Sequence, residues 1–156
     1  MKNTINLNAS IFLGMFILLV SCSKSKDATT DPSNTTAPEL TTSIASGKWI
    51  VSSYSQRTED KTNFFAGYVF TFSSTAANTG TVVAVKDNST ITGSWTHTAA
   101  VTYYGSSSSE ALSLSLPGSN LTKMNKLWNV VTVTATKLTL ASPEIAEDEH
   151  LVLTKQ

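Results

Sequence analysis

Few side chains in this sequence could carry chemistry, since it holds one cysteine and two histidines. Cys22 is a site for covalent modification. His97 and His150 are too few for most metal sites, and no His-x-x-x-His spacing pairs them. The many serines include no Gly-x-Ser-x-Gly motif, and Ser106 to Ser109 are typical of a flexible hairpin loop. The sequence therefore predicts a protein that is not an enzyme and has no metal or cofactor.

Each histidine has an ordinary alternative to catalysis. His97 lies in the apolar phase of its strand beside Trp95, where a structural, hydrogen-bonded histidine is expected more often than a catalytic base. His150 follows Glu147-Asp148-Glu149, which is either a weak cation site or a solvated acidic turn.

Cys22 directly follows an apolar run. Lys2 provides a positive start, and Ile11 to Val20 are apolar over about ten residues, too short to span a bilayer. The sequence Leu19-Val20-Ser21-Cys22 resembles a bacterial lipobox, in which the cysteine receives a diacylglycerol and becomes the new N-terminus. We expect a lipoprotein signal peptide at residues 1–21 and a lipid on Cys22. The alternative is an ordinary secretory signal that leaves Cys22 as a free thiol.

The residues after Cys22 bear on location. By the enterobacterial sorting rule associated with this motif, Ser23 in place of Asp favours a lipid anchor in the outer membrane. Ser23 to Asp27 hold one acid, which favours the periplasmic side over the cell surface.

From Ser23 to about Ser43 the chain has two prolines, one leucine and no aromatic residue, so it buries too little apolar surface to order itself. We therefore expect residues 22–43 to be a lipidated, disordered tether.

The remaining residues, 44–156, have the length of one domain. Eleven basic and eleven acidic side chains balance over the whole chain, and the lysines are scattered. This pattern excludes the basic patch of a nucleic-acid-binding domain. With its only cysteine lipidated, the exported domain has no disulfide, and we expect a monomer that folds by packing alone.

Apolar side chains alternate with hydroxyl side chains through most of the domain, as in half-buried β-strands. Leu112, Leu114 and Leu116 alternate with serines, for example. Turn-forming residues, such as Asp87-Asn88, separate the apolar segments and favour sequential antiparallel hairpins. The expected strands are Lys48 to Ser55, Gly67 to Ser73, Thr81 to Lys86, Thr90 to Thr98, Leu112 to Leu116, Asn129 to Thr136, Lys137 to Ala141 and Leu151 to Lys155.

One segment breaks this alternation. Leu121, Met124 and Leu127 recur at helical spacing after a candidate N-cap at Ser119 or Asn120. The spacing predicts one or two helical turns that close one end of a barrel. Together these patterns predict an all-β, eight-stranded, antiparallel up-and-down barrel with one short helix, because closure removes exposed strand edges.

Several short motifs in this order resemble the lipocalin-like domains of small bacterial lipoproteins. They include Gly47-Lys48-Trp49, Gly67 to Phe72, Gly80 to Ala84, Gly93 to Thr96, Leu127 to Val131, Lys137 to Leu140 and His150 to Thr154. The resemblance implies a lipocalin-like barrel at residues 44–156, with Trp49 closing the barrel floor against a basic residue. Lys155 has the position for that contact. It also implies a cavity for a small apolar ligand, of unspecified chemistry.

An eight-stranded barrel either fills its interior with side chains or holds one small ligand. The candidate residues for the core or cavity are Trp49, Tyr68, Phe70, Phe72 and Trp95. Three non-catalytic functions stay open. The barrel carries a small apolar ligand, or it is filled and binds an envelope protein or glycan through loops, or it inhibits a lytic enzyme, although such inhibitors commonly keep a disulfide. The candidate interaction surface is Val101, Tyr103 and Tyr104, for which an extra stretch of strand is the alternative.

Overall fold

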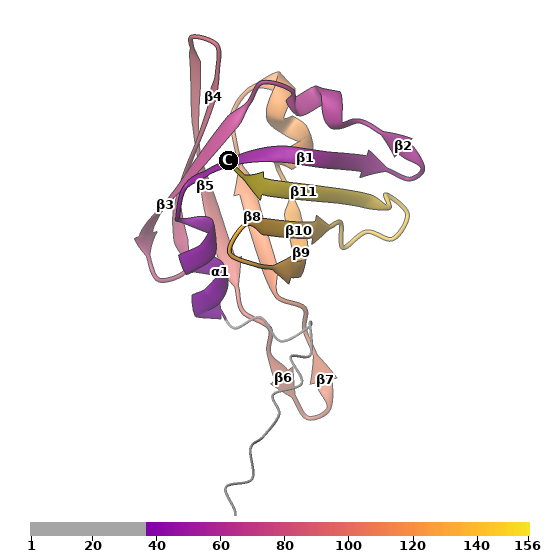
Figure 1. Ribbon diagram of the computed structural model, residues 1–156. Coiled ribbons are helices and arrows are strands. Elements are labelled where there is room, and N and C mark those ends of the chain that lie inside the picture. The colour runs from indigo at the N-terminus through magenta and orange to yellow at the C-terminus, as the bar shows by residue number, and fades with distance from the viewer. Residues whose placement is uncertain (1–36) are drawn as a thin grey trace, which may run out of the picture.

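The computed structural model describes residues 37–156. The signal peptide predicted at residues 1–21, the lipid predicted on Cys22 and the tether predicted at residues 22–36 lie outside the described residues. The described chain is almost entirely β-structure (Figure 1). Its elements in chain order are α1 (Ala37–Ile44), β1 (Lys48–Gln56), β2 (Glu59–Asp60), the 3-10 helix η1 (Thr62–Phe65), β3 (Val69–Ala76), β4 (Thr79–Lys86), β5 (Ser89–Thr98), β6 (Thr102–Tyr103), β7 (Ser106–Ser107), β8 (Ala111–Ser115), the 3-10 helix η2 (Ser119–Met124), β9 (Leu127–Val133), β10 (Lys137–Ala141) and β11 (Glu149–Lys155).

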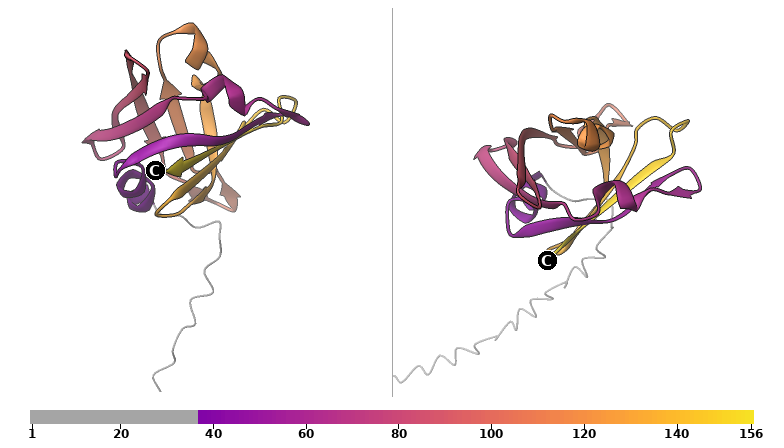
Figure 2. Two further views of the ribbon diagram at one scale, coloured as in Figure 1. Left: turned by 45° about the horizontal axis from the view of Figure 1, so that its top comes forward. Right: turned by 90° about the horizontal axis from the view of Figure 1, so that it is seen from above.

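Eight of these strands close into an antiparallel barrel. They follow one another around it in the order β1, β3, β4, β5, β8, β9, β10 and β11, and β11 pairs again with β1. Seen from above, the strands surround a common interior (Figure 2). The predicted fold class, an all-β eight-stranded antiparallel barrel with one short helix, is confirmed. The short strand β2 only extends the end of β1, and β6 and β7 form a separate hairpin between β5 and β8.

The alternation of apolar and hydroxyl side chains determines which face of each strand is buried. In β5, Trp95 and His97 are buried while Ser94 and Thr96 are exposed. A shift of one residue would turn these faces over, so the alternation also sets the register between strands. The register of β1 against β11 shifts between Val51 and Ser53, which marks a bulge at Ser52. Bulges of this kind bend a strand and help a sheet to close.

The prediction of a disordered tether extending to Ser43 is wrong for residues 37–43, which belong to α1. Leu40 and Ile44 lie one helical turn apart and are both fully buried in the core. The indole nitrogen of Trp49 donates a hydrogen bond to the carbonyl oxygen of Ile44 over 2.9 Å. Composition alone misses this helix, because a segment with few apolar residues becomes ordered once another part of the fold covers those residues.

The helical segment predicted around Ser119 to Leu127 is the 3-10 helix η2, which ends at Met124, and the single α-helix among residues 37–156 is α1. Leu121 and Met124 are buried as expected, but Leu127 belongs to β9 and is half exposed, so its predicted place in the helix is wrong. The N-cap position is occupied by Gly118 and not by Ser119 or Asn120. Gly118 has a φ of 107°, a conformation that side-chain-bearing residues rarely adopt.

Candidate functional site

The barrel interior contains all five residues that the sequence named for a core or cavity. Trp49, Tyr68, Phe70, Phe72 and Trp95 are all buried and belong to one apolar cluster. The Nζ atom of Lys155 lies 5.0 Å from the ring centroid of Trp49. Trp49 therefore packs against α1 on one side and meets a basic residue near the barrel's end, the contact that the lipocalin resemblance implied.

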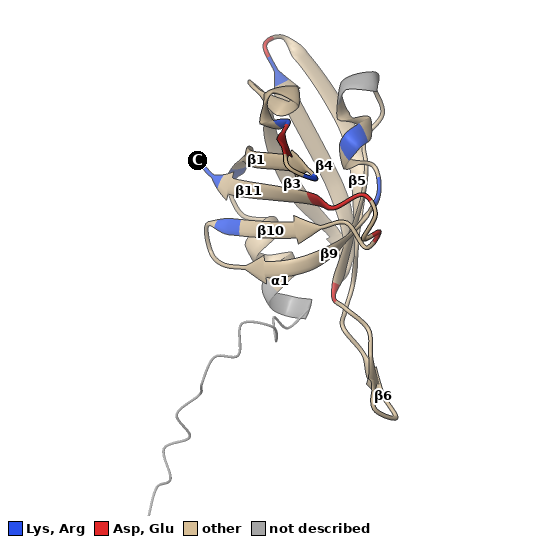
Figure 3. Ribbon diagram, turned by 90° about the vertical axis from the view of Figure 1, so that its right-hand side faces the viewer, with Lys and Arg blue, Asp and Glu red and all other residues tan. Residues whose placement is uncertain are grey.

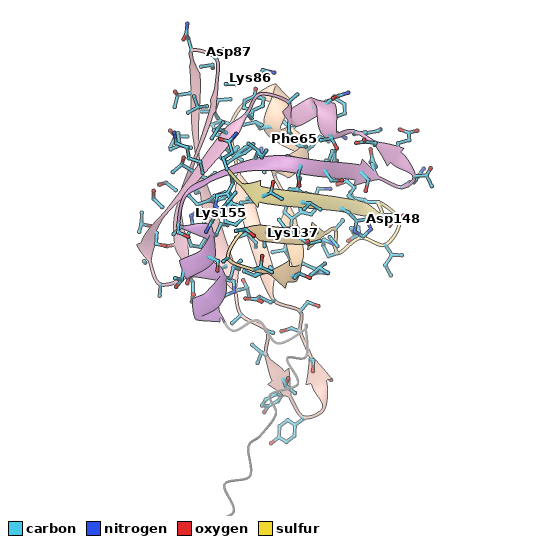
Figure 4. The ribbon with its side chains drawn as sticks, viewed as in Figure 1. Phe65, Lys86, Asp87, Lys137, Asp148 and Lys155 are labelled. Carbon is cyan, nitrogen blue, oxygen red and sulfur yellow. The ribbon has the colours of Figure 1, made fainter. Side chains whose placement is uncertain are left out.

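Other large side chains, not singled out from the sequence, share this interior. Trp128 and Tyr54 are fully buried, and Phe65 of η1 is 5.2 Å from Tyr54 between ring centroids in an edge-to-face arrangement. Figure 4 labels Phe65 above β1, in the upper part of the barrel. Trp49, Trp95 and Trp128 are therefore buried together in one small barrel, whose interior is narrow enough for side chains to fill.

Two polar atoms in this interior have no hydrogen-bond partner among the described residues: the hydroxyl of Tyr54 and the indole nitrogen of Trp95. Burial raises the pKa of Tyr54, and the neighbouring Glu149 carboxylate raises it further, so this phenol stays protonated. The indole of Trp95 lies against Gly80, where a Cβ atom would come within 2.5 Å of its nitrogen. Gly80 therefore leaves the space that the Trp95 ring occupies.

His97 lies near the point where β5 leaves the barrel and is buried with Glu110. Its Nε2 atom is 2.9 Å from Oε1 of Glu110, and its Nδ1 atom is 3.3 Å from Oδ1 of Asn78. The backbone N–H of His97 also donates to the carbonyl oxygen of Asn78 over 2.7 Å. Both ring nitrogens are engaged by neighbouring side chains, which is the geometry of a structural histidine. Glu110 lies two residues before Leu112, so it extends the alternating positions that Leu112, Leu114 and Leu116 bury. This alternation in the sequence could have identified Glu110 as buried.

A second charged cluster joins Lys126, the residue before β9, to β11 and the loop before β11. Lys126 donates hydrogen bonds to Glu149, which is buried, and over 2.7 Å to Glu147. Its Nζ atom also lies 5.3 Å from the ring centroid of Trp128. Burial alone would lower the pKa of Lys126, but these hydrogen bonds outweigh it and raise the pKa. Hydrogen bonds from Lys126 and then from Ser142 lower the pKa of Glu147. The charges in this cluster are therefore paired with one another.

His150 makes an exposed contact with one acidic side chain and is not part of a buried binding site. Its Nε2 atom is 3.1 Å from Asp148 in the turn before β11, and both side chains are exposed. Asp148 is labelled on the flank of the barrel in Figure 4. Within residues 37–156, no group of three His, Cys, Asp or Glu side chains could hold a metal ion. In the same part of the chain, no helix is long and apolar enough to cross a membrane.

The residues proposed for an interaction surface lie on the hairpin of β6 and β7, which projects from one end of the barrel (Figure 1). Val101, Tyr103 and Tyr104 expose 58%, 70% and 90% of their surface. The two tyrosine rings meet edge to face with centroids 4.3 Å apart. The segment does form an extra stretch of strand, as the alternative had it, but that stretch lies outside the barrel and its side chains are exposed.

The turn of this hairpin has an unusual residue for its backbone conformation. Tyr104 and Gly105 connect β6 to β7, and their φ values are 45° and 82°. Two positive φ values at the centre of a two-residue hairpin are typical of a type I′ turn, which favours Asn or Asp before Gly. A tyrosine in this conformation costs about 1 kcal/mol or more. Tyr104 is strained and almost fully exposed, and its ring meets Tyr103 of the same hairpin instead of the barrel core. This makes the turn a candidate functional site.

Charge is absent from this hairpin. No residue from Thr98 to Ser109 is charged, and the lysines, arginines and acids of the described chain lie on the barrel and its other loops (Figure 3). The hairpin thus presents aromatic, aliphatic and hydroxyl groups only.

Comparisons of the chain with models of protein families, with curated proteins and with solved structures found no match.

Proposed function

We propose that this chain is a lipid-anchored protein of the bacterial cell envelope whose lipocalin-like barrel binds a partner and catalyses no reaction. The anchor is proposed from the sequence Leu19-Val20-Ser21-Cys22 behind an apolar run too short to span a bilayer. Several acyl chains on Cys22 would hold the protein at a membrane stably, unlike a single chain. The outer membrane, on its periplasmic side, is the location that Ser23 and the near absence of acids after it favour.

A filled barrel is the version of this function that the geometry supports best. Trp49, Trp95 and Trp128 are buried together with Phe70 and Phe72, so the side chains that would line a ligand cavity pack against one another instead. Removing such packing to admit a ligand would cost several kcal/mol for each large side chain displaced. Binding is therefore expected on the outside of the barrel.

The exposed hairpin of β6 and β7 is the observation that carries the proposal. Strands β5 and β8 already pair directly at Thr98 and Ala111, so the barrel needs no projecting hairpin to connect them. The hairpin also costs conformational strain at Tyr104. An element that the barrel does not need, with exposed aromatic side chains at its tip, fits a binding role.

The test compares the mature protein, isolated from its own envelope, with a variant in which Asn-Gly replaces residues 99–109. In this variant Asn, Gly and the native Glu110 connect Thr98 to Ala111. Native mass spectrometry of the wild-type protein should show the lipidated chain with no small molecule inside. The variant should keep the wild-type stability, because β5 and β8 still pair, and should lose association with its envelope partner. A co-purified apolar molecule retained by the variant would instead make the barrel a carrier and overturn the filled-barrel proposal.

A further inference from the structure

We infer that the partner of the hairpin of β6 and β7 is the surface of the membrane that holds the lipid anchor, with Tyr103 and Tyr104 in the headgroup region. This inference rests on the proposed lipid anchor at Cys22. Together, the anchor and the hairpin would hold the barrel in one orientation on the membrane.

The first argument is the end of the barrel at which the chain enters from the proposed anchor. Helix α1 begins at the same end of the barrel from which the hairpin projects, as both Figure 1 and Figure 3 show. Lys86 and Asp87, at the turn between β4 and β5, mark the opposite end (Figure 4). The 14 residues between Cys22 and Ala37 can span at most about 50 Å when fully extended. The domain therefore stays near its membrane, and the end that carries the hairpin is the end joined to the anchor.

The second argument is chemical. Tyrosine concentrates at membrane interfaces, because its ring prefers the acyl boundary while its hydroxyl stays among water and headgroups. Tyr103 and Tyr104 offer two such side chains on a two-residue turn, and Val101 adds apolar surface behind them. The uncharged stretch from Thr98 to Ser109 avoids the cost of placing a charge in the interface. Because no lysine or arginine contributes, the contact should not require anionic lipids.

The third argument is shape. A stable protein partner generally buries about 800 Å² on each side of an interface, which a hairpin tip of two short strands does not supply alone. A small glycan site is generally concave and directs several polar groups at one ligand, whereas this hairpin is a projection. A fluid lipid surface admits a projecting wedge without a complementary pocket. A lipid surface therefore suits this hairpin better than a protein or a glycan.

The test uses a tryptophan reporter in the full mature, lipidated protein on phosphatidylcholine vesicles whose acyl chains carry bromine. The three native tryptophans are buried in the core, so a new exposed tryptophan reports on its own surroundings. The Tyr104→Trp variant places the reporter in the hairpin turn. The Asn88→Trp variant is the matched control, because Asn88 is exposed in the two-residue turn beside Asp87 at the opposite end of the barrel.

We expect the brominated lipid to quench Trp fluorescence in Tyr104→Trp and not in Asn88→Trp, and dissolved acrylamide to quench the second variant more strongly. Equal quenching of the two variants, or stronger lipid quenching in Asn88→Trp, would overturn the inference. The mass of the same preparation separates the two proposals. A chain without a lipid mass on Cys22 would overturn the proposed anchor, whereas a lipidated chain with a water-exposed reporter at position 104 overturns only the membrane contact.

Discussion

At the scale of single residues, Trp49 connects the two ends of the described chain. It pairs with Lys155 of β11 in register, lies beneath its ammonium group and donates a hydrogen bond to Ile44 of α1. Trp49→Ala should therefore reduce the free energy of unfolding by roughly 3 to 5 kcal/mol, measured by denaturant unfolding. Phe64→Ala, at a half-exposed aromatic residue, is the control and should change it little. Wild-type stability in Trp49→Ala would contradict its place in the core.

His97 and Glu110 form a buried pair whose partners depend on each other. Removing the imidazole in His97→Ala would leave the Glu110 carboxylate buried without this contact, which should cost about 3 kcal/mol of stability. Replacing both members, in His97→Leu with Glu110→Leu, removes the buried charge as well and should be less harmful than His97→Ala alone. Denaturant unfolding of His97→Ala, of the single variants His97→Leu and Glu110→Leu, and of the double variant gives this comparison. Losses that simply add would show that the pair does not act as a unit.

Lys126 gives stability a pH dependence that can be followed in acid. Because the pKa of Glu147 is lowered in the folded protein, its contribution is present above its ordinary pKa of 4.5 and is lost as the pH falls through the folded-state pKa. The free energy of unfolding should therefore decrease on acidification below about pH 4.5. In Lys126→Met this acid slope should become smaller, since the main cause of the shift is gone.

The raised pKa of Lys126 predicts a second pH dependence, at alkaline pH. Stability should be lost as the pH rises through the folded-state pKa of Lys126, which lies above 10.5. Lys137→Met is the control, because Lys137 is exposed at the start of β10. An acid slope that is the same in Lys126→Met and in Lys137→Met would rule out this cluster as its source.

At the scale of elements, Gly93 of β5 allows neighbouring strands to approach closely. A Cβ atom on Gly93 of β5 would lie 2.1 Å from the carbonyl oxygen of Ser115 and 2.9 Å from Cα of Leu116. These are backbone atoms of β8 and of the residue that follows it, so they cannot rotate away as the end of a side chain could. Gly93→Ala should therefore cost about 3 kcal/mol by forcing β5 and β8 apart. Thermal unfolding alongside Ser94→Ala, an exposed neighbour in the same strand, tests this, and equal melting temperatures would refute it.

Strands and the α-helix differed in how far the sequence predicted them. The barrel strands, such as β8 and β10, follow from period-two alternation, and their bounds lie within a few residues of those expected. Helix α1 did not follow, because it contributes only Leu40 and Ile44 to the core. Two apolar residues in a polar segment are no signal in themselves. They become ordered because α1 packs against β3, β5 and β9, where both residues join the core.

At the scale of the whole molecule, the proposed anchor determines where the barrel works. Cys22→Ala should prevent lipid attachment and the cleavage that depends on it, leaving an uncleaved or soluble precursor. Membrane fractionation with intact-mass analysis of the wild-type and variant chains checks this, and Ser23→Ala is a control that keeps the cysteine. A Cys22→Ala chain that is fully cleaved and bound to the membrane would disprove the lipoprotein assignment.

The sequence by itself determined the all-β class, the number of barrel strands and their order, because alternation along the chain states which face of each strand must be buried. It also singled out Trp49, Trp95 and the tyrosines of the hairpin by residue type. The tertiary structure alone decided which polar groups meet. His97 is 13 residues from Glu110 along the chain, and Lys126 is 23 residues from Glu149. Neither separation predicts that the two residues are in contact. Only closure of the barrel brings such residues together, and only closure separates its buried interior from the hairpin of β6 and β7 that projects beyond it.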